Sequence, residues 1–110
     1  MLARPADARA DNSAVMVSGD LLARNRDEVV AVVEKHGARN PRVFGSVARG
    51  TDSVGADVDL LVTFPDTAAR LSFFELTEAL EALLTVDVDL VDDASGGPAV
   101  EQARREALAL

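Results

Sequence analysis

Acidic side chains recur at two-residue spacing in two β-rich segments of the chain. Asp57 and Asp59 flank Val58, and Asp87 and Asp89 repeat the spacing. Side chains two positions apart on a strand point to the same face, with Cβ atoms about 6–7 Å apart. If the two strands are neighbours, three or four carboxylates converge, and their mutual repulsion raises each pKa. Mg²⁺ prefers such oxygen ligands and keeps positions for waters or substrate phosphates, so the pattern predicts a metal–phosphate site.

A glycine–serine turn precedes the first acidic pair. Gly45-Ser46 directly follows a β segment, and a helical turn opening there would present free backbone N–H groups to a phosphate. Gly45 lets the phosphate approach the backbone closely, and Arg49, one turn later, can reach a phosphate or a neighbouring carboxylate. Acids on a solvent-facing strand are common, and a glycine–serine turn alone indicates little. Together they favour Mg²⁺–nucleotide chemistry, which needs both.

These residues carry a family resemblance. Gly45-Ser46, the ten residues 47–56, and Asp57-Val58-Asp59 match the GSX10DXD signature of the nucleotidyltransferase superfamily. The longer string GSVARGTDSVGADVDLLV resembles the MNT-type minimal nucleotidyltransferases, and the resemblance covers residues 20–109. Asp89 matches the third acid of the family, whereas Asp87 is an additional one. Ala56 replaces a serine that is frequent in the family, which removes a hydroxyl but no acid.

The resemblance implies an activity and a role for each site residue. Members of the family transfer a nucleoside monophosphate, usually AMP from ATP, to a hydroxyl with loss of pyrophosphate. The carried-over roles make Asp57, Asp59 and Asp89 the catalytic and metal-binding acids, with Asp89 also helping to activate the attacking hydroxyl. Mg²⁺ is the implied cofactor, and it lowers the pKa of the nucleophile and neutralises phosphate charge. The implied triphosphate ligands are Gly45, Ser46 and Arg49.

The resemblance also implies a partner. Free-standing proteins of this size resemble the antitoxins of two-gene toxin–antitoxin pairs, whose partners are HEPN-domain ribonuclease toxins modified on a tyrosine. Two alternatives stay open at this point. One is a vestigial antitoxin that neutralises its partner by binding alone, and the other is a nucleotidyltransferase with a small-molecule or RNA acceptor. The intact acids favour catalysis, and the lack of a basic patch weighs against an RNA acceptor.

The composition predicts one acidic domain. The chain has 110 residues, with 11 Lys and Arg against 19 Asp and Glu, and a formal net charge of −8. Such a chain is not expected to bind a nucleic-acid backbone directly. It contains no cysteine, which excludes disulfides and thiol nucleophiles. Neither a targeting segment nor a membrane span is visible, so we expect a cytoplasmic protein without membrane contacts.

The elements that must position these residues alternate between helical and β patterns. The sequence predicts a helix at 20–36, a strand at 42–44, a loop at 45–56 that opens with one helical turn, a strand at 58–64, a helix at 69–84, a strand at 86–91 and a helix at 98–109. This order predicts an α/β (α+β) domain, a small mixed sheet with helices packed against it. The resemblance specifies the nucleotidyltransferase fold, which is DNA polymerase β-like.

The pattern also sets the limits of the domain and several structural roles. We expect a disordered tail at 1–18 and a minimal nucleotidyltransferase domain at 19–110. Ser18 is predicted to cap the first helix, and Asp92-Asp93 to form a turn after the last strand. The predicted buried face of helix 69–84 consists of Leu71, Phe74, Leu80 and either Leu83 or Leu84.

Overall fold

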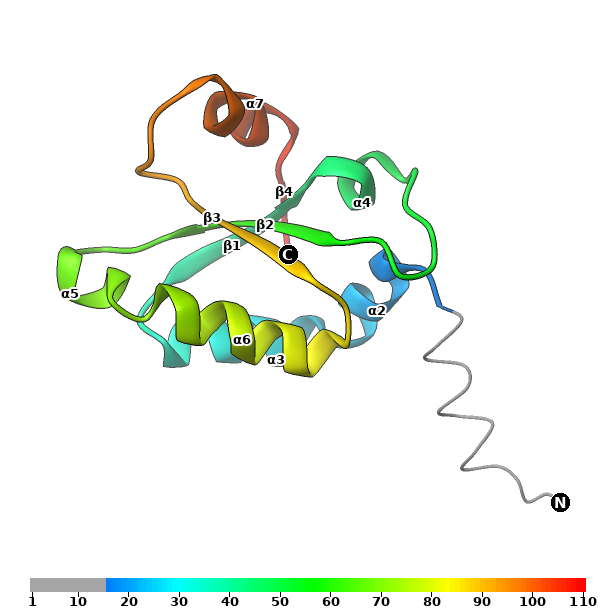
Figure 1. The fold of residues 1–110 in the computed structure, drawn as a ribbon, viewed down its shortest axis with the longest axis horizontal. Helices are drawn as coiled ribbons and strands as arrows, with labels where there is room; N and C mark the ends of the chain where they lie inside the picture. Colours follow the sequence, from blue (N-terminus) through cyan, green and yellow to red (C-terminus); the bar gives the residue numbers. More distant parts are fainter. Residues whose placement is uncertain (1–15) are drawn as a thin grey trace, which may run out of the picture.

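The computed structural model describes residues 16–110, so most of the predicted tail lies outside the described part (Figure 1). The helices are α2 (Ser18–Arg24), α3 (Arg26–Lys35), α4 (Gly45–Arg49), α5 (Thr67–Arg70), α6 (Phe73–Leu84) and α7 (Pro98–Glu106). The strands are β1 (Arg39–Phe44), β2 (Val58–Thr63), β3 (Val88–Asp92) and β4 (Leu108–Ala109). They form a sheet in the order β3-β2-β1-β4, in which β2 and β3 are parallel and β1 is antiparallel to both of its neighbours. The predicted α/β fold with a small mixed sheet is confirmed.

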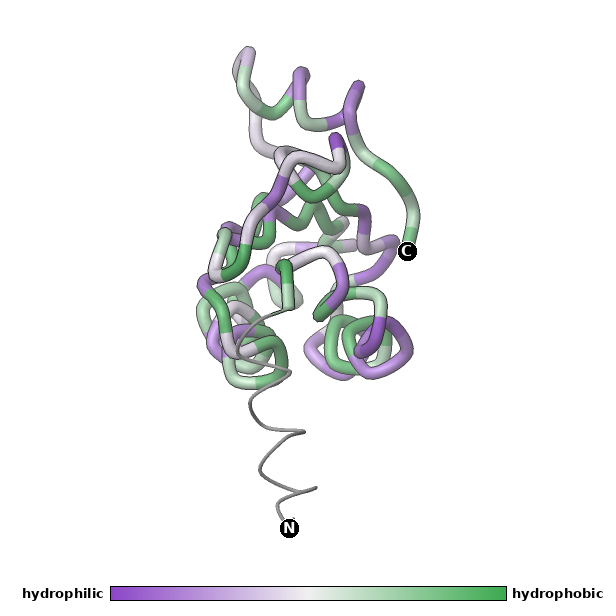
Figure 2. Tube along the Cα trace, turned by 90° about the vertical axis from the view of Figure 1, so that its right-hand side faces the viewer, coloured by the Kyte–Doolittle hydropathy of each residue, from purple (hydrophilic) through white to green (hydrophobic). Residues whose placement is uncertain are grey.

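The main hydrophobic core lies between the sheet and helices α3 and α6, which cover one face of it (Figure 1). The fully buried side chains of this core include Val29, Val33, Val58, Leu60, Val62, Leu76, Leu80 and Leu84. In Figure 2 hydrophobic and hydrophilic stretches alternate around the turns of the helices below the sheet. Each of these helices therefore buries one side, and each fully buried Leu or Val contributes roughly 1.5–3 kcal/mol.

The predicted helix 20–36 is two helices in the structure. Asn25 separates α2 from α3, with φ and ψ of −106° and 17°. Its side-chain amide donates a hydrogen bond to the Leu21 carbonyl at 2.8 Å. Asparagine side chains that bond to the local backbone compete with the helical hydrogen-bond ladder, which accounts for the break at this position.

The start of α2 is tied to the loop that precedes β2. The hydroxyl of buried Ser18 donates to the Ala56 carbonyl, and the Gly19 N–H donates to Asp52 Oδ2 at 2.7 Å. The prediction that Ser18 caps the helix is therefore wrong, because Val17 occupies the N-cap position. The Ser18 hydroxyl instead helps to hold the loop that leads into the acidic pair.

The predicted helix 69–84 is interrupted by a turn between α5 and α6. Leu80 is buried as predicted, but Leu71 and Phe74 are 80% and 79% exposed, so their assignment to the core is wrong. Leu71 lies in the turn between α5 and α6. A buried helix face predicted by counting helical turns from Leu71 therefore points in the wrong direction for α6. The buried residues of α6 are spaced four apart, at Leu76, Leu80 and Leu84.

The last predicted helix, 98–109, ends early. Helix α7 has Pro98 in its first turn, and it ends at Glu106. The following Leu108 and Ala109 form β4, which pairs with the edge of β1. This pairing satisfies backbone groups that a further helical turn would have satisfied internally. The reversal from α7 into β4 brings the end of α7 close to α4.

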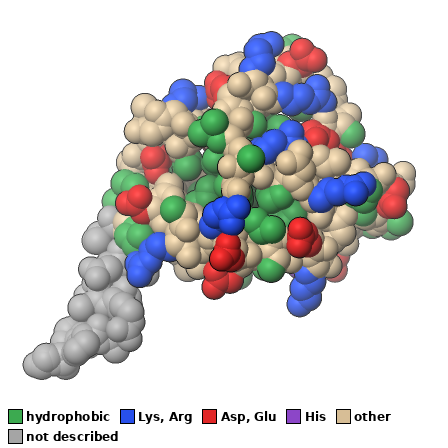
Figure 3. Space-filling model, turned by 180° about the vertical axis from the view of Figure 1, so that it is seen from behind, with side chains coloured by type: hydrophobic (Ala, Val, Ile, Leu, Met, Phe, Trp, Pro, Cys, Tyr) green, Lys and Arg blue, Asp and Glu red, His purple; other side chains and the backbone are tan. Residues whose placement is uncertain are grey.

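The surface seen from behind carries charges of both signs. In Figure 3 hydrophobic side chains gather near the middle of this face, and Lys, Arg, Asp and Glu side chains are interspersed around them. No continuous basic surface is visible from this side. Among the helices of residues 16–110, none combines the length and apolar character that a membrane crossing requires.

Candidate active site

Two of the predicted acids, Asp59 and Asp89, lie on one face of the sheet. Asp59 and Asp89 are register partners in the parallel pair of β2 and β3. The next residues along the strands, Leu60 and Leu90, are buried in the core. Because side chains alternate along a strand, both acids face away from α3 and α6. Asp57 lies two residues before Asp59, immediately ahead of β2, so the three carboxylates share one end of the β2–β3 pair.

Asp59 is the most shielded of the three acids. It is half-buried, whereas Asp57 and Asp89 are exposed. Burial raises the pKa of Asp59 above its usual value, the charges of Asp89 and Asp57 raise it further, and the charge of Arg49 opposes them. The ionised form of Asp59 is therefore less favourable than that of a free aspartate, and a cation beside the three acids would stabilise it.

Gly45 packs directly against Asp59, which explains the glycine in the motif. The chain turns from β1 into α4 at Gly45, whose φ is +71°, and the preceding Phe44 is the register partner of Asp59. A Cβ on Gly45 would overlap Oδ2 of the Asp59 carboxylate. Both the left-handed backbone and the lack of space therefore favour glycine. The ten residues between Ser46 and Asp57 form the connection that returns the chain to the sheet, so that Asp59 lies beside Gly45.

Arg49 contacts an acid that sequence reasoning did not single out. Its Nη1 lies 3.2 Å from Oε1 of Glu106, at the end of α7. The backbone N–H of Gly45 donates to the same oxygen at 3.3 Å. Glu106 lies 61 residues after Gly45 in the chain, and its local pattern is that of an ordinary surface helix. No local signal could have placed it beside the motif.

Ser46 and Asp87 complete the set of residues at this end of the sheet. Ser46 is half-buried in the first turn of α4, and its carbonyl accepts a hydrogen bond from the Thr51 N–H at 2.9 Å. Asp87 is exposed just before β3, and its carbonyl accepts from the Val58 N–H at 3.0 Å. The backbone of Asp87 thus links the starts of β2 and β3.

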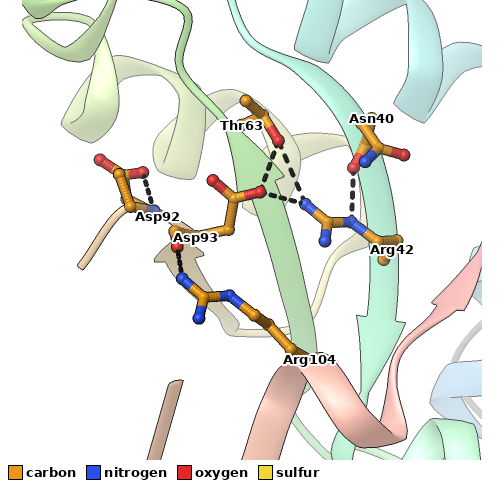
Figure 4. A network of polar contacts seen from close by, with 7 residues as sticks. Asn40, Arg42, Thr63, Asp92, Asp93 and Arg104 are labelled. Carbon is orange, nitrogen blue, oxygen red and sulfur yellow. Dashed lines mark hydrogen bonds and ion pairs between the residues drawn. The ribbon is translucent and has the colours of Figure 1, made fainter. Parts of the chain in front are cut away.

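A polar network lies at the opposite end of the same strands (Figure 4). Asp93 Oδ2 accepts hydrogen bonds from Thr63 Oγ1 at 2.6 Å and from Arg42 Nη2 at 2.7 Å. Arg104 of α7 donates to the backbone carbonyl of Asp93. Burial raises the pKa of Asp93, but the hydrogen bonds from Thr63 and Arg42 and the charges of Arg42 and Arg104 outweigh burial and lower it. The network fixes α7 on the side of the sheet that carries the acids.

The prediction that Asp92-Asp93 is simply a turn is wrong for Asp92. Asp92 ends β3, is buried, and pairs with Arg70 Nε at 2.5 Å. Asp93 does lie in the turn, but its side chain joins the network. Its partner Arg42 is 51 residues away in the sequence, so only the folded chain could reveal the contact.

The three acids have the donor chemistry that Mg²⁺ requires. Carboxylate oxygens are its preferred protein ligands, and it usually takes one or two of them together with waters and substrate phosphates. In residues 16–110, no three acidic or histidine side chains are already gathered closely enough to hold a metal ion. The residues therefore fit Mg²⁺ by their chemistry and by the shared face of Asp59 and Asp89, without forming a closed cage.

Comparison with known sequences agrees with this arrangement. The nucleotidyltransferase domain family matches residues 30–106. The protein adenylyltransferase MntA of Thermococcus cleftensis is 48% identical over 62 residues, which cover 56% of this chain and 63% of that protein. The chain thus spans less than two thirds of this curated relative.

Solved structures agree as well. One assigned to the minimal nucleotidyltransferases is 42% identical, with a TM-score of 0.73, over 84% of this chain and 95% of that chain. A crystal structure of a toxin–antitoxin complex with AMP-PNP matches with 26% identity and a TM-score of 0.67, over 77% of this chain and 71% of that chain. The mixed sheet, with its acids beside a glycine–serine turn, defines a nucleotidyltransferase fold. The chain belongs to the nucleotidyltransferase domain family, as an MNT-type minimal nucleotidyltransferase.

Proposed function

We propose that the chain transfers AMP from ATP to a hydroxyl group of a partner protein. The observation that carries this proposal is the register pairing of Asp59 with Asp89 beside Gly45. The acceptor oxygen forms a bond to the α-phosphorus, and the bond from that phosphorus to the oxygen bridging to the β-phosphate breaks. Pyrophosphate leaves, and the proton of the acceptor hydroxyl is released to a base.

The glycine–serine turn and Arg49 hold the triphosphate in this proposal. The Gly45 N–H and the Ser46 hydroxyl donate hydrogen bonds to the β- and γ-phosphates, and Gly45 leaves room for them because it has no Cβ. The Arg49 guanidinium adds a charge-assisted contact from the same short helix. The phosphates then lie beside the acids, because Gly45 packs against Asp59.

The carboxylates divide two tasks between them. Asp57, Asp59 and Asp89 would hold Mg²⁺, and Asp59 is the half-buried residue of the three. A bound Mg²⁺ neutralises phosphate charge and lowers the pKa of the attacking hydroxyl. Asp89, which is exposed, faces the acceptor and helps to activate its hydroxyl.

The proposed partner is a HEPN-domain toxin, modified on a tyrosine and thereby neutralised. The name of the Thermococcus relative, protein adenylyltransferase, supports protein as the acceptor. The toxin–antitoxin complex with AMP-PNP, a structural neighbour, supports both an ATP substrate and a toxin partner. The net charge of −8 suits a partner that binds RNA through basic residues. We propose that the reaction takes place in the cytoplasm, where ATP is available.

The test is transfer of label from ATP to the partner. The chain is incubated with Mg²⁺, α-labelled ATP and the product of the adjacent gene, and label on the partner is followed by electrophoresis and mass spectrometry. We expect label on a partner tyrosine with the native chain and at least a 100-fold loss with Asp59→Asn. Asp27→Asn is the matched control, because Asp27 is 92% exposed and lies on α3, away from the site.

The alternatives give different results in the same assay. A partner that gains no label yet loses toxicity when bound would support neutralisation by binding alone. Label on RNA or on a small molecule, but not on the partner, would support the other acceptor classes. Full activity of Asp59→Asn would contradict the assignment of the acids.

A further inference from the structure

The Glu106 carboxylate accepts hydrogen bonds from Gly45 and Arg49, two of the residues that are proposed to bind the triphosphate. Its Oε1 accepts both from the Gly45 N–H at 3.3 Å and from Arg49 Nη1 at 3.2 Å. Its other oxygen, Oε2, accepts from Gln102 Nε2 at 3.2 Å. The Glu106 side chain is 25% exposed, so it is held in the site by three contacts and not extended into solvent.

A carboxylate and a phosphate cannot both accept from the single Gly45 N–H. Arg49 has further N–H groups, but a phosphate bound to them would lie close to the Glu106 carboxylate. One N–H hydrogen makes one strong hydrogen bond, and two anions on the same donors repel each other. We infer that Glu106 is an internal competitor for the triphosphate: it accepts hydrogen bonds from Gly45 and Arg49, and it has to release them when ATP binds. This inference rests on the proposed function, which assigns those donors to the β- and γ-phosphates.

The location of Glu106 allows this exchange without unfolding. It is the last residue of α7, and Ala107 after it is already extended, with φ and ψ of −66° and 138°. The contact between Arg104 and Asp93 keeps helix α7 attached to the sheet, so only the last residue of the helix has to move. The three contacts of Glu106 are hydrogen bonds and a partly exposed ion pair, which a multiply charged ligand can replace.

The competition has a consequence for specificity. A ligand with β- and γ-phosphates gains the donors that Glu106 releases, whereas AMP has no phosphate that reaches them. Glu106 therefore weakens the binding of ATP but not that of AMP. Removing the Glu106 carboxylate is expected to raise the affinity for ATP and to leave the affinity for AMP unchanged. A general loosening of the fold would not separate the two nucleotides in this way.

The experiment measures nucleotide binding by calorimetry with the full chain and Mg²⁺. The probes are AMP-PNP and AMP, and the variants are Glu106→Ala and Glu106→Gln. We expect Glu106→Ala to bind AMP-PNP about 3- to 10-fold more tightly, the effect of one hydrogen bond and one half-exposed ion pair. Glu106→Gln, which keeps an acceptor but loses the charge, is expected to show a smaller gain, and AMP affinity is expected to stay within about twofold.

Glu101→Gln is the matched control, because it removes the same charge from α7. Glu101 is 62% exposed and pairs only loosely with Arg104, at 3.8 Å. It should leave AMP-PNP affinity unchanged, and circular dichroism establishes that every variant is folded. Unchanged or weaker AMP-PNP binding by both Glu106 variants would overturn the inference and leave the proposed function intact. Equal gains for AMP and AMP-PNP would also overturn it, and lack of AMP-PNP binding by every chain would overturn both.

Discussion

Replacing Gly45 by alanine tests the contact between the two halves of the motif. Gly45 has a φ of +71°, and an added Cβ would overlap Oδ2 of Asp59. Gly50 is a natural control, because its φ of +74° is nearly the same and an added Cβ would have nothing within 4 Å. The two substitutions therefore share the backbone cost and differ in the contact with Asp59.

The expected magnitudes follow from these two effects. An alanine in the left-handed region costs about 1–2 kcal/mol relative to glycine. Forcing an extra carbon into an occupied space adds about 1–3 kcal/mol. Gly50→Ala should therefore lower the free energy of unfolding by about 1–2 kcal/mol, and Gly45→Ala by about 2–5 kcal/mol. The difference, about 1–3 kcal/mol, measures the contact with Asp59.

The assay is urea denaturation followed by far-ultraviolet circular dichroism, since the chain contains no Trp or Tyr for fluorescence. Adding Asp59→Ala to Gly45→Ala should recover most of the difference, because it removes the carboxylate that the new Cβ meets. Adding Asp59→Ala to Gly50→Ala should recover none of the lost free energy of unfolding. If Gly45→Ala and Gly50→Ala lower the free energy of unfolding equally, Gly45 does not pack against Asp59 and the site geometry is wrong.

Two further predictions concern pH and metal. Asp93→Asn should lower the free energy of unfolding by about 1–3 kcal/mol at pH 7, because it weakens charge-assisted hydrogen bonds. Since the folded pKa of Asp93 is lowered, its contribution is present above the unfolded pKa of about 3.9 and is lost as the pH falls, so urea midpoints of the two chains should converge in acid. Asp59→Asn should raise the melting temperature at pH 7 in the presence of EDTA, because the raised pKa of Asp59 means that its ionisation is less favourable in the folded chain than in the unfolded chain. Added Mg²⁺ should then stabilise the native chain more than this variant, and an equal response of both would contradict the metal assignment.

The local signals in the sequence were reliable where one segment determines its own conformation. The strand around Asp57 and Asp59 and the helical turn at Gly45 were predictable, because alternation and glycine act within a few residues. The prediction failed for Leu71 and Phe74, since the break between α5 and α6 shifts the helical phase. It also failed at Ser18, whose hydroxyl has its partner 38 residues away.

The end of the chain shows why some elements escape local reasoning. Residues 108–109 continue a helical pattern, yet they form β4 because β1 has an open edge there. Helix propensities differ by less than about 1 kcal/mol per residue for ordinary residues, so a tertiary hydrogen-bonding partner can override them. The same reversal of the chain brings Glu106 to Gly45.

The linear order of residues already shows that Asp57 and Asp59 stand two positions apart at the start of a β segment, and that a glycine precedes them at a set distance. Both features are local, so they can be read without knowledge of the fold. The folded chain alone shows that β3 lies parallel to β2 with Asp89 beside Asp59, and that Glu106 lies against Gly45 and Arg49. Strand neighbours and register depend on how the whole chain buries its apolar side chains, and no single segment contains that information.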